Sequence, residues 1–350
     1  MVRGGDRELR GTTKMKRQIT KKAFLTLGLI CLLFVMIPVT AFSWNQATHA
    51  YIADRLNARV GYDNLNEMWG SVAPDLYNFV FDPALCPGWI ADQTQGTYSE
   101  TFMKVWNAAE TNSEDALAYG FVSHNQQWGA DYTAHISGLR PGYENEGYII
   151  TKAKLLLNAP LDPASPQQTF GDVFAGLGMS PDEALLIAHV ITEDAVDIRL
   201  GNEVDPLLGR RLATSARNET KRFRALLIKA YAADYADYCF GGDLSTAASV
   251  LTATEEGHRK DMIFLGQAIS QSEPAAAQLL AEQLVSILPE FLGHALPVPE
   301  AEAVRIVKAA IFQSMGICDD YLAEINATIE FVGKNLEDHG IIYLVHGNPK

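Results

Sequence analysis

The chain has 350 residues, with 42 acidic against 28 basic side chains and a formal net charge of −14. This length allows one large domain, or a core domain with an elaboration. The acid excess argues against non-specific binding to nucleic-acid backbones or anionic bilayers, although it leaves a phosphate substrate open where a metal supplies local positive charge.

The first 43 residues are typical of a secretory signal peptide. Eight of the basic residues come first, an apolar run covers residues 23–37, and the segment closes on Ala41-Phe42-Ser43. This order predicts cleavage after Ser43. The alternative, a membrane-anchoring helix, is disfavoured because the apolar run is short for a membrane span and ends at Pro38. Cleavage leaves 307 residues with a net charge near −20, starting at Trp44, and predicts a secreted or periplasmic protein.

Helical spacing dominates the remainder of the chain. Apolar residues recur at intervals of three and four over residues 48–58, 98–111, 114–123, 148–157, 169–177 and 181–199. Ser180-Pro181-Asp182-Glu183 has the order of an N-cap, a first-turn proline and first-turn acids, which predicts a helix start. Few segments alternate apolar and polar residues, so the predicted fold class is all-α.

Two interruptions and one break organise these predicted helices. Residues 78–98 and 138–143 are rich in proline, glycine and polar residues, which predicts loops. The break over residues 201–208 divides a predicted core, 44–205, from a helical C-terminal region, 206–350, that completes or caps the domain. An apolar stretch at 284–296 in this region is a candidate for peripheral membrane contact.

The cysteines give no metal signal. Cys31 lies in the leader, so cleavage leaves Cys86, Cys239 and Cys318, and none of them has C-x-x-C spacing. One disulfide is compatible with three cysteines, but the sequence does not indicate which pair forms it.

Histidines and acids at helical spacing carry the chemical signal. Asp131 and His135 are four residues apart, as are His189 and Glu193, so each pair lies on one helix face and can bind one metal. The alternative for a single pair is a surface ion pair. That alternative is weaker for His189, because its helix is strongly apolar and a buried His and Glu require a partner. A buried His–Glu hydrogen bond remains the competing interpretation there.

Together with Trp44 as the first mature residue, His49 and His124, these pairs resemble the zinc-dependent phospholipases C of bacteria. The fungal and plant single-strand nucleases and the N-terminal domain of glycosylphosphatidylinositol-specific phospholipase D are relatives of that family. The resemblance covers residues 44–199, about half of the mature chain, and implies an all-helical domain with two or three zinc ions.

The resemblance also implies a role for each residue near the mature N-terminus. The amine and carbonyl of Trp44, with His49, are similar to the ligands of one zinc. Asp131 is similar to the carboxylate that bridges this zinc to a second one, which His124 also holds.

The remaining residues follow in the same way. His135, His189 and Glu193 resemble the ligands of a third zinc. Asp75, in an Ala-Pro-Asp segment, resembles an aspartate beside the metal-bound water, where it is a ligand or a general base. Taken alone, Asp75 is equally well explained as a turn residue after proline.

Two features depart from the family pattern. The family has a histidine between the first aspartate and the residue corresponding to His124, and this chain has none; Asp92, Gln93, Thr97 or Glu100 is a candidate substitute, and a two-zinc site is the other outcome. In addition, His124 and Asp131 are seven residues apart where the family has four, which indicates a three-residue insertion within residues 125–129.

The function that the resemblance implies is hydrolysis of a phospholipid or a related phosphodiester, in which zinc-activated hydroxide attacks phosphorus. A nuclease of the same fold is the first alternative, although the acidic surface predicts no stable nucleic-acid partner. A secreted metal-binding protein that has lost activity is the second alternative, and the missing histidine supports it. The head group, the side of the phosphate that is cleaved and the oligomeric state are not predicted.

Overall fold

Helices make up nearly all of the regular structure in the computed structural model, which describes residues 44–56, 62–79, 86, 89, 100–162, 166–218 and 221–342. These residues form fourteen α-helices and no β-strand, so the predicted all-α fold class is confirmed. The predicted signal peptide and most of the predicted 78–98 loop lie outside the described residues.

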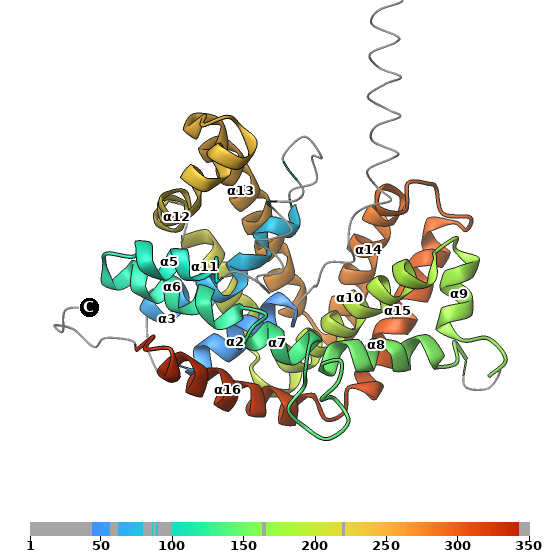
Figure 1. The fold of residues 1–350 in the computed structure, drawn as a ribbon. Coiled ribbons are helices and arrows are strands. Elements are labelled where there is room, and N and C mark those ends of the chain that lie inside the picture. Colours follow the sequence, from blue (N-terminus) through green and yellow to red (C-terminus); the bar gives the residue numbers. More distant parts are fainter. Residues whose placement is uncertain are drawn as a thin grey trace, which may run out of the picture. The chain divides into compact units, whose positions relative to one another are not determined.

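The elements, in chain order, are α2 (Gln46–Leu56), α3 (Tyr62–Val72), the 3₁₀ helix η2 (Ala73–Phe79), α5 (Met103–Ala108), α6 (Asn112–His124), α7 (Ala130–His135), α8 (Tyr148–Asn158), α9 (Phe170–Gly176), α10 (Pro181–Arg199), the π-helical turn η4 (Leu200–Val204), α11 (Leu208–Asn218), α12 (Arg222–Cys239), α13 (Leu244–Ile269), α14 (Glu273–Leu292), α15 (Glu300–Ile317) and α16 (Tyr321–Asp338). Figure 1 shows their arrangement.

Local sequence signals set several of the helix ends. Ser180 caps α10 as predicted: its side chain accepts from the Glu183 amide, and the Glu183 carboxylate accepts from the Ser180 amide in return. Thr111 caps α6 through the same reciprocal bonds with Glu114, so this helix begins slightly before the predicted start at residue 114.

Helix α3 is not among the predicted helical segments, although its Leu65, Met68, Trp69 and Val72 recur at intervals of three and four. It packs closely against α6, and two glycines lie at the contact. A Cβ on Gly70 would lie 2.0 Å from the Leu117 carbonyl oxygen, and one on Gly120 would lie 2.0 Å from the Glu67 carbonyl oxygen. The two backbones therefore approach more closely than any larger side chain would permit.

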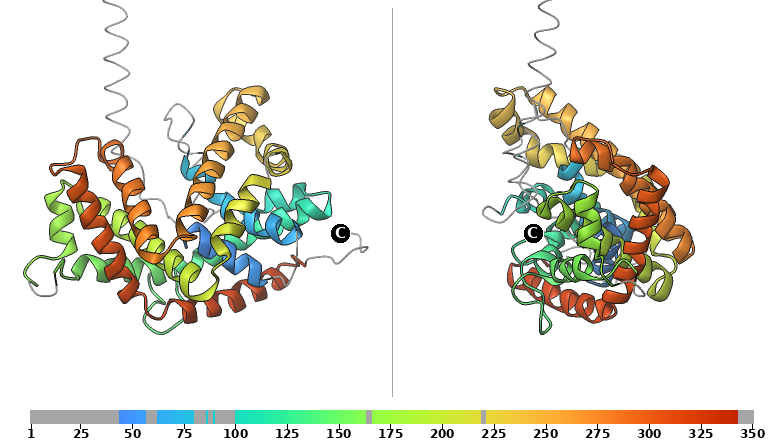
Figure 2. Two further views of the ribbon diagram at one scale, coloured as in Figure 1. Left: turned by 180° about the vertical axis from the view of Figure 1, so that it is seen from behind. Right: turned by 90° about the vertical axis from the view of Figure 1, so that its right-hand side faces the viewer.

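Helices α2 and α10 lie in the interior of this helical body. Contacts surround α2 on several sides, from α3, α11, α16 and α10, while α10 contacts α8, α9, α14 and α15 (Figures 1 and 2). Ligand-type side chains on α2 and α10 are therefore buried wherever they face these neighbours.

The C-terminal helices pack directly against the predicted core. Helix α11 contacts α2 and α3, α13 contacts η2, and α14 and α15 contact α10. All the described helices belong to one compact unit, Val39–Lys350. Within the apolar stretch, Leu284 and Leu288 are buried and Ile287 is 53% exposed, so packing accounts for much of its hydrophobicity. Among the described helices, none has the length and hydrophobicity needed to cross a membrane.

Candidate metal centre

Two groups of buried histidine and carboxylate side chains lie in the described part of the chain, and either could hold a metal ion. The first consists of His135, His189 and Glu193, and we name it the α7/α10 triad. The second consists of His49, His124 and Asp131, and we name it the α2/α6/α7 triad. In each group one ligand-type atom from every residue lies within 4.8 Å of the others.

Three ligand atoms converge in the α7/α10 triad. His189 Nε2 lies 2.7 Å from Glu193 Oε1 and 3.0 Å from His135 Nε2, and His135 Nε2 lies 3.7 Å from the same Glu193 oxygen. Ligands at 2.0–2.1 Å from a tetrahedral zinc are about 3.3 Å from one another. The observed separations lie on both sides of that value.

The competing interpretation, a buried His189–Glu193 hydrogen bond, explains only part of this arrangement. That bond is present, but His135 Nε2 reaches the same point from another helix. Two imidazole nitrogens and a carboxylate oxygen directed at one position, all from buried residues, match the donor set of a catalytic zinc site.

Backbone and side-chain contacts orient His124 in the second triad. His124 Nδ1 bonds to the Ser71 carbonyl at 2.8 Å, so Nδ1 carries the proton and Nε2 is left as the electron-pair donor. Its ring stacks on the ring of His49, with centroids 4.0 Å apart. Asp75 Oδ1 lies 3.7 Å from His124 Nε2. The contact with a backbone carbonyl is the usual way in which a protein fixes the tautomer of a ligand histidine.

Helix α7 connects the two triads. Asp131 Oδ1 lies 2.8 Å from His135 Nδ1, one helical turn along the same face. The carboxylate thus belongs to one triad and lies against the ring of His135 in the other triad, and His135 Nε2 lies 3.0 Å from His189 Nε2. The two triads therefore form one continuous cluster.

The turn between α6 and α7 explains the unusual spacing of His124 and Asp131. Helix α6 ends at His124, and the Asn125 side-chain oxygen accepts from the amides of Gln127, Trp128 and Gly129. Helix α7 then begins at Ala130. The predicted insertion over residues 125–129 is thus a compact turn closed by Asn125, and it brings the two ligand-type residues together despite the seven-residue separation.

The segment Trp44–His49 contacts all the other elements that carry candidate ligands. The Trp44 indole donates to Thr133 Oγ1 on α7 at 3.0 Å, and Gln46 Nε2 donates to Asp75 Oδ2 on η2 at 2.6 Å. Asn45 Nδ2 donates to Asp194 on α10 at 2.7 Å, while His49 stacks on His124 of α6. Residue 44 is thereby held at the cluster.

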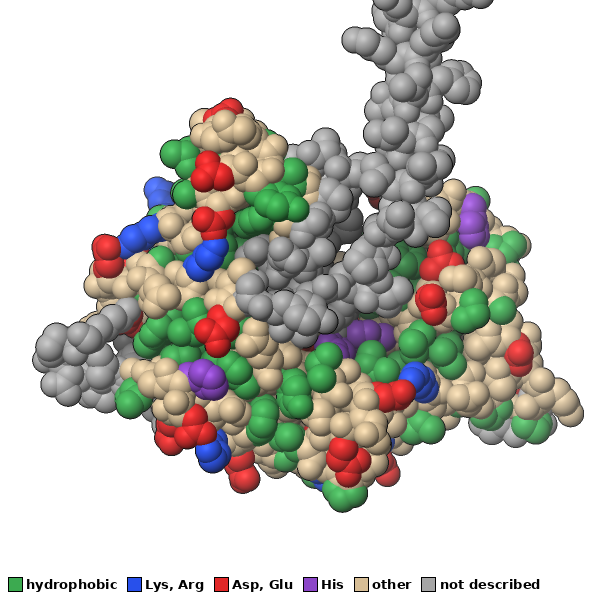
Figure 3. Space-filling view, viewed as in Figure 1, with side chains coloured by type: hydrophobic (Ala, Val, Ile, Leu, Met, Phe, Trp, Pro, Cys, Tyr) green, Lys and Arg blue, Asp and Glu red, His purple; other side chains and the backbone are tan. Residues whose placement is uncertain are grey.

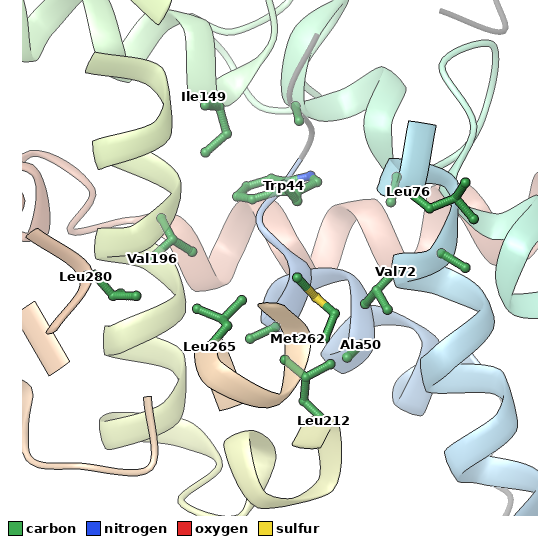
Figure 4. Close-up of a cluster of buried hydrophobic side chains, with 14 of the residues drawn as sticks. Trp44, Ala50, Val72, Leu76, Ile149, Val196, Leu212, Met262, Leu265 and Leu280 are labelled. Atoms are coloured by element: carbon green, nitrogen blue, oxygen red, sulfur yellow. The ribbon is translucent and has the colours of Figure 1, made fainter. Parts of the chain in front are cut away.

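Packing and a buried carboxylate reinforce this placement. Trp44 is fully buried, stacks on Tyr148 and lies between Ile149 and Leu76 in Figure 4. At the start of α2, the Ala47 and Thr48 amides donate to the Asp197 carboxylate at 2.9 and 2.8 Å. Asp197 therefore caps α2 from a neighbouring helix and fixes the direction in which the helix carries His49.

Burial shapes the charge state of these groups. It lowers the pKa of His49 well below its usual value, and repulsion from His124 and His135 lowers that pKa further. It also raises the pKa of Glu193 well above its usual value, with a contribution from nearby carboxylates. Neutral imidazoles beside crowded carboxylates are the state in which a metal cation is most favourably bound, since it replaces the missing positive charge.

Asp75 lies beside the cluster on η2 and is buried. Burial raises the pKa of its carboxyl group, while His124 lowers it. Because Gln46 holds Oδ2 and His124 lies near Oδ1, the carboxylate has a fixed orientation. A residue in a free turn would lack these contacts.

Of the candidate substitutes for the missing histidine, Glu100 is exposed, and Asp92, Gln93 and Thr97 lie outside the described residues. A further histidine, His258, is not among the predicted ligands. His258 is fully buried, and its Nε2 bonds to the Val72 carbonyl at 3.0 Å, next to η2. It is a packing residue that supports the end of α3, outside both triads. Its sequence signal is helical spacing from Leu251, Met262 and Leu265, which predicts only that His258 faces the core.

The predicted ligands are thus close together in the described chain, and the least buried of the six triad residues is His135, at 9% exposure. Figure 3 shows histidine side chains near the centre of one face of the molecule.

Comparison with protein-family models, with curated proteins and with solved structures finds no match to this chain.

Proposed function

We propose that this chain is a zinc-dependent phosphodiester hydrolase of the phospholipase C type, acting outside the cytoplasm on a phospholipid or a related phosphodiester. The observation that carries the proposal is the set of contacts made by Trp44–His49 with α6, α7, α10 and η2. These contacts join residues 44–49 to the elements that carry the candidate ligands, which supports a site that a terminal amine at Trp44 would complete.

The ligand chemistry favours zinc. Imidazole nitrogen and carboxylate oxygen in a four-coordinate arrangement are typical zinc ligands, whereas magnesium and calcium prefer oxygen alone. The α7/α10 triad would hold one ion and the α2/α6/α7 triad another. After cleavage, the amine and carbonyl of Trp44 would join His49, because an α-amine with a pKa of about 7.7–8.0 loses its proton readily.

A bound zinc lowers the pKa of its water from about 15.7 to about 7 and stabilises negative charge on phosphoryl oxygens. The side chains around the metal site would orient the reacting groups and transfer protons. Asp75, whose Oδ2 accepts from Gln46 and whose Oδ1 lies 3.7 Å from His124 Nε2, would orient a water or accept its proton. The Ser71 carbonyl fixes the ring of His124, so its Nε2 keeps one direction, and the Asp131 carboxylate lies 2.8 Å from His135 Nδ1.

The substrate class rests on charge. A mature chain with a net charge near −20 repels a polyanionic strand along its whole length, whereas a single phosphodiester head group needs to approach only the metal cluster. We therefore favour a phospholipid-like substrate over a nucleic acid. Membrane contact through residues 284–296 is not required by this proposal, because Leu284 and Leu288 are buried.

Metal content and turnover of a generic chromogenic phosphodiester test the proposal together. We expect two or three zinc ions per chain, turnover that a chelator abolishes and zinc restores, and loss of at least one ion in Glu193→Gln. The matched control is His294→Gln, since His294 is exposed and outside both triads. Fewer than two ions, or turnover insensitive to chelation, would contradict the proposal.

A second comparison then assigns the substrate. Faster chelator-sensitive hydrolysis of a phosphatidylcholine emulsion than of single-stranded DNA supports the phospholipase assignment, and the reverse order supports the nuclease alternative. The binding-protein alternative has one specific observation in its favour, the absence of any histidine between Asp75 and His124. Two bound zinc ions without turnover of any phosphodiester would establish it.

A further inference from the structure

Two cysteines that are far apart in the sequence contact each other in the fold. The thiols of Cys86 and Cys239 are close enough to interact with one another. Both side chains are partly buried and pack against the hydrophobic core. Cys239 is the last residue of α12, whereas Cys86 lies between η2 and α5.

Aromatic packing sets the register of this contact. Trp89 stacks on Tyr235 of α12, with ring centroids 4.1 Å apart, and its amide donates to the Cys86 carbonyl at 3.1 Å. This backbone hydrogen bond ties Cys86 to Trp89. Tyr235 and Cys239 are four residues apart on one face of α12. The stacked pair therefore holds Cys86 near the end of α12 that carries Cys239.

The backbone at Cys86 is a second, independent observation. Its φ is 58°, in the left-handed region, and no other non-glycine residue in the described chain has a positive φ. A side chain with a Cβ rarely adopts this conformation unless surrounding contacts hold it there. At Cys86 this backbone conformation occurs together with the hydrogen bond from the Trp89 amide and the interaction with Cys239.

We propose that Cys86 and Cys239 form a disulfide bond in the mature protein. Two neighbouring thiols can form an S–S bond of about 2.05 Å where the backbone holds their segments side by side, as the stacked Trp89–Tyr235 pair does here. The bond would join the segment that follows η2 to the end of α12. It is independent of the proposed metal chemistry.

The oxidant for this step is a low-molecular-weight disulfide such as oxidised glutathione. The thiolate of Cys86 attacks one sulfur of the oxidant and releases the other as a thiolate. Cys239 then loses its proton to solvent and attacks Cys86 Sγ, which releases the second small thiolate. Two protein thiols are oxidised and one small disulfide is reduced to two thiols.

Burial and the contact with Cys86 raise the pKa of the Cys239 thiol to about 12, so Cys239 is protonated at neutral pH. A protonated Cys239 is a poor nucleophile, so it acts as the second, resolving cysteine in this step. Formation of the mixed disulfide removes the thiol contact at Cys239 and favours its subsequent ionisation.

Cys318 belongs to a different environment. It is fully buried at the end of α15, where its thiol contacts the hydroxyl of Tyr148. It has no access to solvent oxidant in the folded chain. Cys318 is therefore expected to stay a thiol, and Cys318→Ser serves as the matched control.

Peptide mass mapping of the protein, oxidised with glutathione disulfide and digested without reductant, tests the proposal. We expect a linked peptide pair containing Cys86 and Cys239, which reduction separates, in the native chain and in Cys318→Ser. Because each cysteine is assigned from its own peptide, the result does not depend on whether residues 1–43 are present. Unlinked Cys86 and Cys239 peptides, or a link from either to Cys318, would overturn the proposal.

Thermal unfolding provides the second measurement. Reduction should lower the midpoint of the native chain and of Cys318→Ser by roughly 5–10 °C, because the crosslink closes a long loop. The same treatment should leave Cys86→Ser and Cys239→Ser unchanged. Equal sensitivity to reduction in all four proteins would contradict the assignment.

Discussion

Gly129 is the residue at which the geometry of the α6–α7 turn is most directly tested. A Cβ at this position would lie 2.5 Å from the Asn125 amide nitrogen and 2.6 Å from both the Asn125 carbonyl oxygen and the His124 carbonyl carbon. All three are backbone atoms, so no side-chain rotation can relieve the contacts. In Gly129→Ala the turn must open.

The cost follows from two effects. Overpacking of this kind costs about 1–3 kcal/mol. Opening the turn also weakens the three bonds that the Asn125 side chain accepts, each worth about 0.5–1.5 kcal/mol. We expect Gly129→Ala to lose about 2–4 kcal/mol of unfolding free energy in total. Displacement of α7 also moves Asp131 and His135 together, so metal content should fall at both triads.

Urea unfolding of the metal-free protein and metal analysis of the loaded protein are the two assays. Gly257→Ala is the matched control, because a Cβ at Gly257 in α13 meets nothing within 4 Å. An alanine in an open helical position should be neutral or stabilising by up to about 1 kcal/mol. The reasoning is refuted if Gly129→Ala unfolds at the wild-type free energy and retains its full metal content.

Three further predictions concern the surroundings of the cluster. Asp197→Asn replaces one acceptor oxygen with a donor facing the first turn of α2, and should lower the urea unfolding free energy by about 1–3 kcal/mol, against no loss for Asp237→Asn at an exposed position near the end of α12. At Asp320, burial raises the carboxyl pKa, but hydrogen bonds from Lys152 and Tyr143 outweigh it and lower the pKa to about 2. The ionised Asp320 carboxylate therefore stabilises the fold above pH 3.8, the ordinary pKa, and this stabilisation is lost as pH falls from there towards about 2. Over this pH range the difference in urea midpoint between wild type and Asp320→Asn should shrink. A form that retains a few residues before Trp44 should bind one zinc fewer than a form that begins at Trp44, and equal metal content in the two would count against the terminal amine as a ligand.

Helical spacing predicts the ligand pairs because one helix face is a local property. His189 and Glu193 share a face of α10, and Asp131 and His135 share a face of α7, and these relations need no knowledge of the fold. The apolar neighbours of His189 also predict its burial. Convergence of the two pairs on a common cluster is not local, and only the resemblance to a known family suggested it.

Leu65, Met68, Trp69 and Val72 give α3 helical spacing, but spacing does not predict how closely α3 packs against its neighbour. Its contact with α6 depends on Gly70 and Gly120, which permit close backbone approach but contribute no apolar side chain to a periodic pattern. The sequence also does not predict that Asn125 closes the α6–α7 turn, because a polar residue after a helix is consistent with any loop. Its three accepted bonds appear only when the turn has formed.

The buried acids of α10 link the metal cluster to the chain start. Glu193 and Asp197 are one turn apart on this helix, so a single rigid element carries a candidate ligand and the carboxylate that caps α2. Asp194, between them, accepts from Asn45. Because α2 carries His49, the separation of His49 from Glu193 is set by one helix and one capping interaction. A loss of the cap would then affect metal binding without removing a ligand, which distinguishes Asp197 from the residues of the triads.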